Sequence, residues 1–499
     1  MKILLISLQP NTDTIGLKYI HSYLRKNGVD SHILFLPSFN AEAIPVIKDF
    51  VQLFTPGIVG ISLMSDSYDK AQLISSEIKK AFPQICIVWG GIHPSIAPEE
   101  CLNSADYVFI GESEVSFLEF ATALDARRSP RAVLNLAFRE SGRVVINALR
   151  PLNNDLDVFP FPEHHPEKSF ILHRNRIVPM DNDLFKKYSR FSGRFYSLIT
   201  IRGCPFSCSY CCNSFLAKLY GVHRVRERRV DNVIEELSCA IKLYPDIVYV
   251  IIHDDDFFAH GSNWIKDFAE KYQEQIRTRF ICCGTPNTIT EEKIRLLKAS
   301  GLSWIFIGLQ SGSERTKKDI YLRSVPNEKL LRAAHLTNKY TIAALYDIIL
   351  DNPFETEEDI LETINLILKI PRPFQFQLYS LTFYQGTEIY AHAVADNLPI
   401  ENPCSKNYFK YKHILLNKII RMCPLLPKSL IAFLVAHRHR PAVALMTTCL
   451  YPFIVAIIEP VTWLRLILFS FDYRIIPAMD MIGAFARTGF SKLILRRAA

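Results

Sequence analysis

The sequence predicts an α/β protein in three parts: a doubly wound parallel sheet, an open barrel of β/α units and a helical C-terminal region. Short apolar runs alternate with helical patterns along residues 1–145, and the same alternation returns over residues 191–400. Residues 401–499 differ from both, because their apolar stretches are much longer than a strand. A proline-rich segment within residues 146–190 predicts a linker between the two α/β parts.

The first part should bind a ligand at one edge of its sheet. Five apolar runs have strand length, and they cover residues 1–8, 31–36, 58–63, 85–91 and 107–111. In a doubly wound sheet the ligand lies beyond the carboxyl ends of the strands, and glycines there let backbone approach it closely. The candidate binding residues in these loops are Ser62, Leu63, Gly90, Gly91, Gly111 and Glu112.

The second part has about six β/α units, too few for a closed barrel of eight. Its strands are expected within residues 196–201, 247–252, 280–284, 304–310, 344–350 and 374–381. Functional side chains of such barrels gather where the strands end. Polar candidates at two of these ends are Asp254, Asp255, Gln310 and Glu314.

Three cysteines lie in the loop that follows the first of these strands. Cys204, Cys208 and Cys211 have the spacing C-x₃-C-x₂-C. Cysteine thiolates are the usual ligands of iron–sulfur clusters, and four are the normal complement, so three would leave one iron open. A zinc site and three unrelated core thiols are the alternatives, but zinc usually requires a second pair or histidines at a set distance, and no second pair at such spacing exists.

This loop resembles the cluster-binding motif of the radical S-adenosylmethionine (SAM) superfamily. Tyr210 matches the aromatic residue that the family favours before the third cysteine. The resemblance implies a [4Fe-4S] cluster on Cys204, Cys208 and Cys211. Its open iron would chelate the amino and carboxylate groups of SAM, and reductive cleavage would give a 5′-deoxyadenosyl radical.

The resemblance extends to the barrel. It implies a partial (β/α)₆ radical SAM barrel, open on one side. Asp254 or Asp255 would contact the methionyl amino group or the ribose of SAM. The segment Gly308–Glu314 resembles a family motif in which Gln310 or Glu314 would bind the same cofactor.

The first part looks like the Rossmann-like cobalamin-binding domain attached to class B radical SAM enzymes. Ser62-Leu63-Met64 stands where the wider cobalamin fold carries a Ser-x-Leu turn, with Met64 in place of the leucine. The signature D-x-H-x-x-G, which supplies a histidine to cobalt, is absent after the first strand. A flavodoxin-like or relic domain that no longer binds corrin therefore remains an alternative.

The activity that the resemblance implies is methyl transfer to an unactivated carbon of a hydrophobic small molecule, lipid-like or tetrapyrrole-like. One SAM would supply the methyl group through cobalamin and another the radical, with electrons from a donor such as a flavodoxin or ferredoxin. A radical SAM cyclase or rearrangement enzyme is the second hypothesis. A non-catalytic iron–sulfur redox or binding module is the third. No catalytic residue beyond the cofactor contacts is identified.

The positive charge belongs to the C-terminal part. Residues 401–499 hold fourteen Lys and Arg against four Asp and Glu, although the whole chain has a net charge of only +8. The rest of the chain is therefore slightly acidic, which does not suggest a nucleic-acid partner. The N-terminus lacks the pattern of a secretory signal, so we expect a cytoplasmic protein.

The apolar stretches at residues 441–471 predict contact with a membrane surface. Residues 441–458 carry no formal charge, but eighteen helical residues span roughly 27 Å, short of a hydrocarbon core of about 30 Å. Pro452 and the flanking arginines favour peripheral contact with anionic lipid. A soluble helical cap over the open side of the barrel and a true membrane span remain alternatives.

Overall fold

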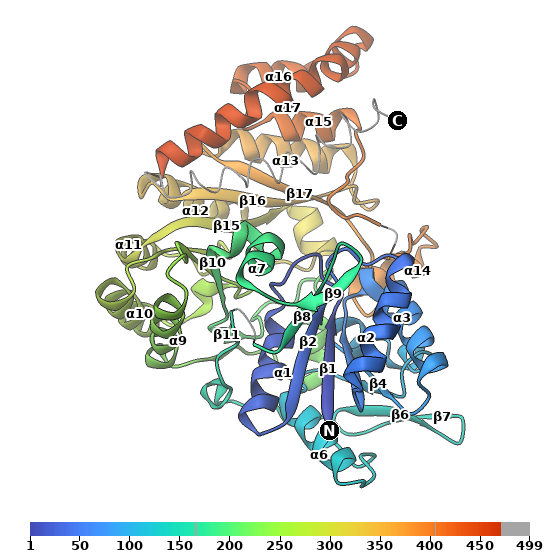
Figure 1. The fold of residues 1–499 in the computed structure, drawn as a ribbon. Helices are drawn as coiled ribbons and strands as arrows, with labels where there is room; N and C mark the ends of the chain where they lie inside the picture. The colour runs from blue at the N-terminus through green and yellow to red at the C-terminus, as the bar shows by residue number, and fades with distance from the viewer. Residues whose placement is uncertain (165–166, 405, 471–499) are drawn as a thin grey trace. The chain divides into compact units, whose positions relative to one another are not determined.

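A computed structural model of the chain describes residues 1–164, 167–404 and 406–470 (Figure 1). The chain divides into two compact units, each assembled from segments distant in sequence. The first unit consists of residues 1–197, 210–232 and 383–406, and the second of residues 198–209, 233–382 and 407–499.

The first unit is built on a nine-stranded sheet with the order β7-β6-β5-β4-β3-β1-β2-β8-β9. The strands from β5 to β8 in this order pair in parallel, and the strands at both edges are antiparallel. The strands are β1 (Lys2–Ser7), β2 (Asp30–Phe35), β3 (Ile58–Ser62), β4 (Cys86–Gly90), β5 (Tyr107–Phe109), β6 (Leu136–Glu140), β7 (Arg143–Ile146), β8 (Ser169–His173) and β9 (Arg176–Pro179).

Helices cover both faces of this sheet, as the alternation of strands and helices predicted (Figure 1). Side chains point alternately to the two faces of a strand, so Leu4 and Ile6 enter one apolar core while Ile3 and Leu5 enter another. The helices of this unit are α1 (Ile15–Lys26), α2 (Ile44–Phe54), α3 (Tyr68–Ala81), α4 (Ile92–Ile96), α5 (Pro98–Cys101), α6 (Glu114–Asp125), α7 (Asn182–Tyr188), α8 (Cys212–Tyr220) and α14 (Glu388–Ala395).

The predicted linker forms part of the first unit. Residues 169–179 form β8 and β9, and β8 pairs in parallel with β2 from Ile33↔Ser169 to Phe35↔Ile171. The added strands cover an edge of β2 that would otherwise expose unpaired backbone groups. The sequence pattern missed this role because the strand pair is short and follows a proline-rich stretch.

The second unit contains a six-stranded sheet with the order β10-β13-β14-β15-β16-β17. Strands β13 to β17 pair in parallel, in agreement with the predicted open barrel. The strands are β10 (Phe195–Leu198), β13 (Tyr249–Ile252), β14 (Arg279–Gly284), β15 (Leu302–Gln310), β16 (Ala343–Leu350) and β17 (Gln375–Ser380). The helices that alternate with them are α9 (Val230–Leu243), α10 (Ser262–Gln275), α11 (Glu291–Ser300), α12 (Asn327–Lys339) and α13 (Glu357–Lys369).

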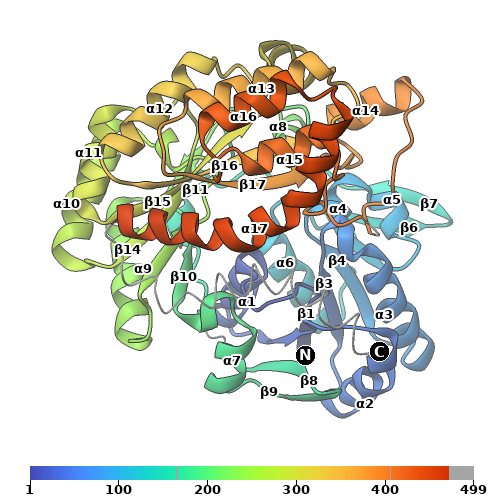
Figure 2. The same ribbon diagram turned by 90° about the horizontal axis from the view of Figure 1, so that it is seen from above.

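Three further helices of the second unit follow the barrel: α15 (Leu415–Met422), α16 (Lys428–Ala436) and α17 (Pro441–Phe469) (Figure 2). The uncharged run that the sequence shows at residues 441–458 is only the first part of α17, which continues through Pro452 and Pro460. Each proline removes one backbone hydrogen bond, but the packing of α17 against α15, β16 and β17 holds the helix together. Residue 471 of the predicted segment lies outside the described residues.

Candidate functional site

A buried carboxylate holds the strand end from which the cysteine loop begins. Asp254 follows β13 and accepts hydrogen bonds from the backbone nitrogens of Thr200, at 2.7 Å, and Ile201, at 3.1 Å, and from the Thr200 hydroxyl. Burial raises the pKa of Asp254 to about 7, although these hydrogen bonds oppose the shift. Asp254 therefore positions the backbone just before the three cysteines.

The neighbouring acids have different surroundings. Asp256 is buried and binds the loop after β14, accepting from Thr288 Oγ1 at 2.8 Å and from the Thr285 backbone nitrogen at 3.2 Å. Asp255 is exposed. The prediction that Asp254 and Asp255 contact SAM stays a prediction, and Asp255 is the one with a solvent-accessible side chain.

The second unit holds Cys204 and Cys208, and the chain enters the first unit before Cys211, which is the N-cap residue of α8. Among the described residues no group of three His, Cys, Asp or Glu side chains surrounds a single metal-ion position. A cubane cluster does not require one, because each thiolate binds a different iron. The donor chemistry of the loop therefore fits a cluster better than a zinc ion.

A cation lies against one of the predicted cluster ligands. Arg323 is buried, and its Nη1 lies 3.8 Å from Cys208 Sγ, while its Nη2 donates to the Gly308 carbonyl at 3.0 Å. The next residue of the cysteine loop, Ser209, is anchored to the same segment through Ser209 N to Tyr321 O, at 2.9 Å. These two contacts attach this part of the cysteine loop to the segment that carries Tyr321 and Arg323.

Asp347 lies in the middle of β16, beside the arginine. In the strand register it stands opposite Gly308 of β15 and Gln377 of β17. Its Oδ1 is buried and has no hydrogen-bond partner among the described residues. Burial raises the pKa of Asp347 to about 7, and the charge of Arg323 opposes the shift. A carboxyl group with a raised pKa and an unpartnered buried oxygen is a candidate for binding a ligand group.

Gly308 leaves room for these side chains. A Cβ at Gly308 would lie 2.8 Å from Arg323 Nη2 and 2.8 Å from Gln310 Nε2. Gln310 itself has a φ of 63°, in the left-handed region, where the register between β15 and β16 shifts. Strained backbone of this kind is often kept at functional sites, and here it places the Gln310 amide beside Arg323.

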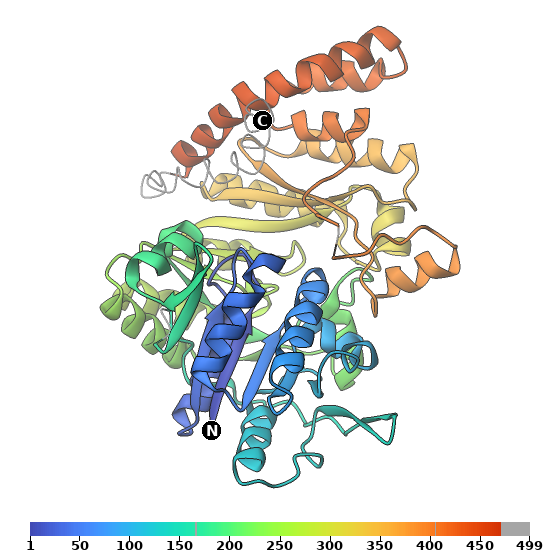
Figure 3. The same cartoon turned by 45° about the vertical axis from the view of Figure 1, so that its right-hand side comes forward.

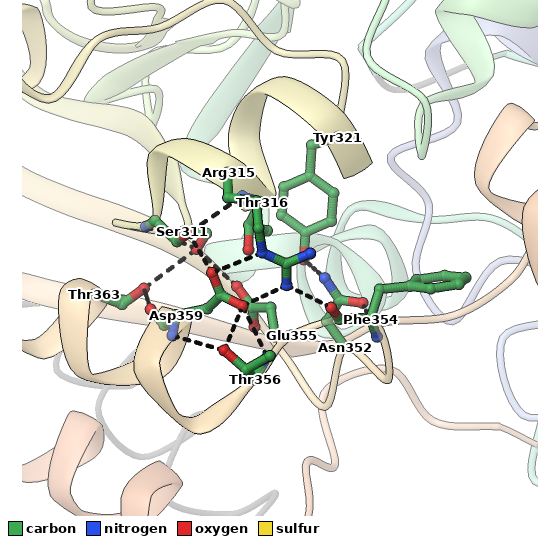
Figure 4. A network of polar contacts seen from close by, with 11 residues as sticks. Ser311, Arg315, Thr316, Tyr321, Asn352, Phe354, Glu355, Thr356, Asp359 and Thr363 are labelled. Carbon is green, nitrogen blue, oxygen red and sulfur yellow. Dashed lines mark hydrogen bonds and ion pairs between the residues drawn. The ribbon is translucent and has the colours of Figure 1, made fainter.

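The loops after β15 and β16 are bound to each other by a polar network (Figure 4). Ser311 Oγ donates to Glu355 at 2.7 Å, and Thr363 Oγ1 accepts from the Gly312 nitrogen at 2.7 Å. Thr356 and Asp359 form a capping box at the start of α13. The network fixes the backbone that carries Gln310.

Glu314 lies at the outer side of these loops. It accepts from the Asn327 backbone nitrogen at 2.9 Å and from Lys317 Nζ at 3.1 Å, and 60% of its side chain is exposed. The structure thus shows Glu314 bracing the start of α12. Its predicted contact with SAM stays a prediction.

A cavity of about 310 Å³ lies between the carboxyl end of β16 and helices α13 and α15. Its polar wall includes Gln310, Glu355 and Asn417. Burial raises the pKa of Glu355 to about 7, although the Ser311 and Thr316 hydroxyls oppose the shift. Its aliphatic residues are Ile348, Ile349, Leu350, Ile360, Ile414 and Ile420. The volume lies at the lower end of the range for small-molecule sites.

In the first unit, two predicted loops meet at the carboxyl ends of β3 and β4. Leu63 N donates to the Gly90 carbonyl at 3.0 Å, and Ser62 stands opposite Gly90 in the register. Gly91 has a φ of 106°, and a Cβ there would lie 2.6 Å from the Leu63 carbonyl oxygen. Only glycine fits this close approach of the two loops.

A buried histidine adds a polar group to the same edge. His93 Nδ1 lies 3.1 Å from Ser65 Oγ, and its Nε2 is buried with no hydrogen-bond partner among the described residues. Burial lowers the pKa of His93, which keeps the ring neutral. An unpartnered imidazole nitrogen beside glycine-lined backbone fits a polar ligand such as the amide-rich periphery of cobalamin.

Gly111 and Glu112 hold a distant segment of the same unit. A Cβ at Gly111 would lie 1.9 Å from the Tyr220 hydroxyl, which accepts from the Glu112 nitrogen at 2.8 Å. The Glu112 carboxylate pairs with the buried guanidinium of Arg226, which also donates to the Asn153 carbonyl at 2.8 Å. The predicted cofactor contact of Gly111 and Glu112 stays a prediction, and the structure shows that they attach the chain after α8.

We expect Arg226→Gln to destabilise the first unit. Removing the cation breaks the ion pair between Arg226 and Glu112. Because 29% of the Glu112 side chain is exposed, the loss should be smaller than for a fully buried pair, and we expect the free energy of unfolding to fall by about 2 kcal/mol. Denaturant unfolding would measure this loss. The matched control is Arg131→Gln, which breaks an exposed pair with Glu140 and should change stability by less than about 1 kcal/mol. Equal losses in both variants would contradict the structural role of Arg226.

The two units together define a class of protein: a parallel sheet with a glycine-lined ligand edge, joined to an open barrel with a three-thiol loop. Comparison with protein families agrees. The radical SAM superfamily model matches residues 198–367, and the B12 binding domain model matches residues 1–121. The chain belongs to the cobalamin-binding radical SAM family. The predicted fold, enzyme class and cofactors (a [4Fe-4S] cluster, SAM and cobalamin) are thereby confirmed.

Curated relatives include two named methyltransferases and a cyclase. The chain is 28% identical over 430 residues to an uncharacterised methyltransferase of Pyrococcus horikoshii, covering 83% of this chain and 87% of the relative. It is 24% identical over 360 residues to an anaerobic magnesium-protoporphyrin IX monomethyl ester cyclase of Rubrivivax gelatinosus, covering 70% and 60%. It is 24% identical over 367 residues to the cytidylyl-2-hydroxyethylphosphonate methyltransferase of Streptomyces wedmorensis, covering 65% and 66%.

Solved structures share the fold. The radical SAM methyltransferase TsrM of Kitasatospora setae superposes with a TM-score of 0.65 at 17% identity, covering 79% of this chain and 76% of that one. The cobalamin-dependent SAM radical enzyme OxsB, with aqua-cobalamin bound, superposes with a TM-score of 0.64 at 16% identity, covering 98% and 75%.

Proposed function

We propose that this protein is a cobalamin-dependent radical SAM methyltransferase that methylates an unactivated carbon of a small, largely apolar molecule. The observation that carries the proposal is a three-thiol loop at the carboxyl edge of the barrel sheet, in a chain that also has a B12 binding domain. When bound, SAM would supply the radical and the methyl group, and cobalamin would carry the methyl group. The names of two relatives support methyl transfer.

We assign roles to the groups around the cysteine loop. Cys204 and Cys208, followed by Cys211 at the start of α8, would hold the cluster. Arg323, whose Nη1 lies 3.8 Å from Cys208 Sγ, would position that ligand. Gln310, placed by its left-handed backbone, and the exposed Asp255 would hydrogen-bond SAM. Asp347, with its unpartnered Oδ1, would bind a polar hydrogen of a ligand in the barrel.

In the first unit, Ser62, Leu63, Gly90 and Gly91 would form the backbone border of the cobalamin site. The close packing of Gly91 on the Leu63 carbonyl explains why the two loops form one edge. His93 would hydrogen-bond the ligand through Nε2, because its Nδ1 is engaged by Ser65 Oγ.

The substrate that the second unit favours is small and mostly apolar. The cavity beside Gln310 is lined by six aliphatic residues and by seven polar ones, among them Asp351, Glu355 and Lys412. Such a lining suits a hydrocarbon body that carries several polar groups. The source of electrons, such as a flavodoxin or ferredoxin, stays a prediction.

The test is an anaerobic assay of the protein reconstituted with iron, sulfide and cobalamin, with SAM and a strong reductant. We expect 5′-deoxyadenosine together with S-adenosylhomocysteine. The formation of S-adenosylhomocysteine should require cobalamin. S-adenosylhomocysteine that forms equally without cobalamin would contradict the proposal. Intact SAM under all conditions would support the non-catalytic module instead.

The second candidate is a radical cyclase, which the name of the Rubrivivax gelatinosus relative favours. A cyclase needs the radical but no methyl transfer. It would give 5′-deoxyadenosine without S-adenosylhomocysteine. The ratio of the two products therefore separates the candidates.

A further inference from the structure

The helix α17 reverses the usual distribution of polar and apolar side chains on a surface helix. It has 29 residues with a mean hydropathy of 2.0 over its most apolar window, and only 6% of that window is buried. A surface helix of a globular protein normally turns its apolar side chains toward the core and its polar ones outward. Figures 2 and 3 show α17 beside α15 and α16, in the second unit.

The polar side chains of α17 face the protein. Thr462 Oγ1 accepts from Gln375 Nε2, at the amino end of β17, at 2.5 Å. Glu459 pairs with Arg421 of α15. The Tyr451 hydroxyl lies 3.0 Å from that of Tyr411. Between positions 451 and 462, these contacts hold one side of α17 against β17, α15 and the segment that carries Tyr411.

The opposite side of α17 is apolar and exposed. Its large side chains recur at intervals of three and four residues, which places them on one face of the helix. They are Met446, Leu450, Phe453, Ile457, Val461, Leu464 and Leu468, each between 43% and 66% exposed. We call these seven residues the outer apolar face.

Most charged residues in the sequence around this face are basic. Glu459 is the only acidic residue between positions 428 and 470, and it is paired with Arg421. The basic residues of the same stretch are Lys428, His437, Arg438, His439, Arg440 and Arg465, of which Arg438 pairs with Glu357 of α13 and His439 lies 3.6 Å from the same carboxylate. The cations of this stretch still outnumber the acids, and an apolar face beside a net positive charge is complementary to the anionic headgroups and acyl chains of a bilayer surface.

We propose that the outer apolar face docks this enzyme on an anionic lipid surface, with α17 lying parallel to the bilayer. A spanning orientation would place Thr462, Glu459 and Tyr451 in hydrocarbon and break their contacts with the barrel, each at a large cost. In the parallel orientation those contacts persist and only the outer face enters the lipid. This inference is independent of the proposed reaction.

The test is flotation of the full chain with vesicles of phosphatidylcholine alone or in an equal mixture with phosphatidylglycerol. We expect binding to the mixed vesicles that weakens with added salt, because the cations contribute electrostatically. The double variant F453S/I457S should weaken binding by at least about tenfold. Arg465→Gln should weaken it by about fivefold on mixed vesicles and little on phosphatidylcholine.

A matched control is available elsewhere on the surface. Leu53 and Leu243 are 84% and 69% exposed and lie outside α16 and α17, so L53S/L243S removes similar apolar area and should bind like the wild type. Wild-type protein that does not float with either vesicle would overturn the proposal. A wild-type dimer in analytical ultracentrifugation that is absent in F453S/I457S would also overturn it, because the outer apolar face would then bind a second copy of the chain. Resistance to extraction by alkaline carbonate would overturn the parallel orientation.

Discussion

Cys208→Ala is expected to abolish the iron–sulfur cluster and SAM cleavage while leaving cobalamin binding unchanged. Cys208 is buried at the loop that follows Thr200 and Ile201, and its sulfur faces Arg323. Without it two thiols remain, which is too few to hold a cluster with one open iron. The yield of 5′-deoxyadenosine should fall by more than about a thousandfold, because no other group in the site can cleave SAM reductively.

The adjacent pair of cysteines supplies the control. Cys212 follows Cys211 directly, begins α8 and is exposed, so Cys212→Ala should keep both iron content and SAM cleavage. Iron and sulfide analysis, cobalamin per chain and the product assay are measured on both variants. A Cys208→Ala protein that still forms deoxyadenosine would show that the ligands are assigned wrongly. Loss of cobalamin together with iron would indicate misfolding, and Cys208→Ser would then replace it as the test.

The cysteine loop was predictable because its signal is local. The spacing of Cys204, Cys208 and Cys211 is contained in eight residues and needs no knowledge of the fold. The same holds for β1 to β5 and for the six strands of the barrel sheet, which were expected from their apolar runs, whereas β6 to β9 were not expected. The capping box of Thr356 and Asp359 is also local, since its partners are three residues apart.

The contacts that tie the site together were not predictable, because their partners are far apart in sequence. Arg323 lies 115 residues from Cys208, and nothing around it in the sequence marks it as a partner of a thiol. Asp254 follows an apolar strand and is predicted to contact SAM, and its hydrogen bonds to Thr200 and Ile201 are contacts that the sequence did not indicate. A local sequence pattern can identify an acidic residue at the end of a strand, but it does not show which groups the side chain binds.

Unit boundaries were missed for a related reason. The first unit takes residues 383–406 from the far end of the barrel sequence, and Gly386 of that segment packs so closely that a Cβ would lie 2.7 Å from Ile96. The thiol of Cys404 similarly donates to the Ser65 carbonyl at 2.8 Å. No composition change marks the point where the chain returns to the first unit. Only the tertiary contacts show it.

Asp347→Asn is expected to stabilise the apoprotein and at the same time to inactivate the enzyme. The buried carboxyl has a pKa of about 7 in the folded protein, against a reference value of 3.8. The unfolded chain therefore loses this proton at lower pH than the folded one. The free energy of unfolding should fall as pH rises from about 4 to 7, and at pH 8 the ionised carboxylate should cost up to about 4 kcal/mol.

An amide has the same shape and no charge, so Asp347→Asn should recover part of this cost, on the order of 2 kcal/mol at pH 8 and little near pH 4. Asp359→Asn is the control of opposite sign. Burial raises the pKa of Asp359, but hydrogen bonds from Arg315, Ser313 and Thr356 outweigh it and hold that pKa well below its usual range. Its ionised form is therefore stabilising above about pH 4, and the amide should destabilise at pH 8.

Urea unfolding of the apoprotein at pH 4 and pH 8, with the product assay at pH 8, distinguishes a functional from a structural aspartate. If Asp347 only packs the barrel, the amide should stabilise without loss of product, and the ligand-binding role is wrong. If Asp347 binds a ligand group, the more stable variant should lose product formation by roughly a hundredfold, the scale of about 3 kcal/mol of lost interaction with a charged partner. Asp347→Asn would then raise stability and lower activity. Opposite effects of this kind are expected where a site keeps an unpartnered charge for its ligand.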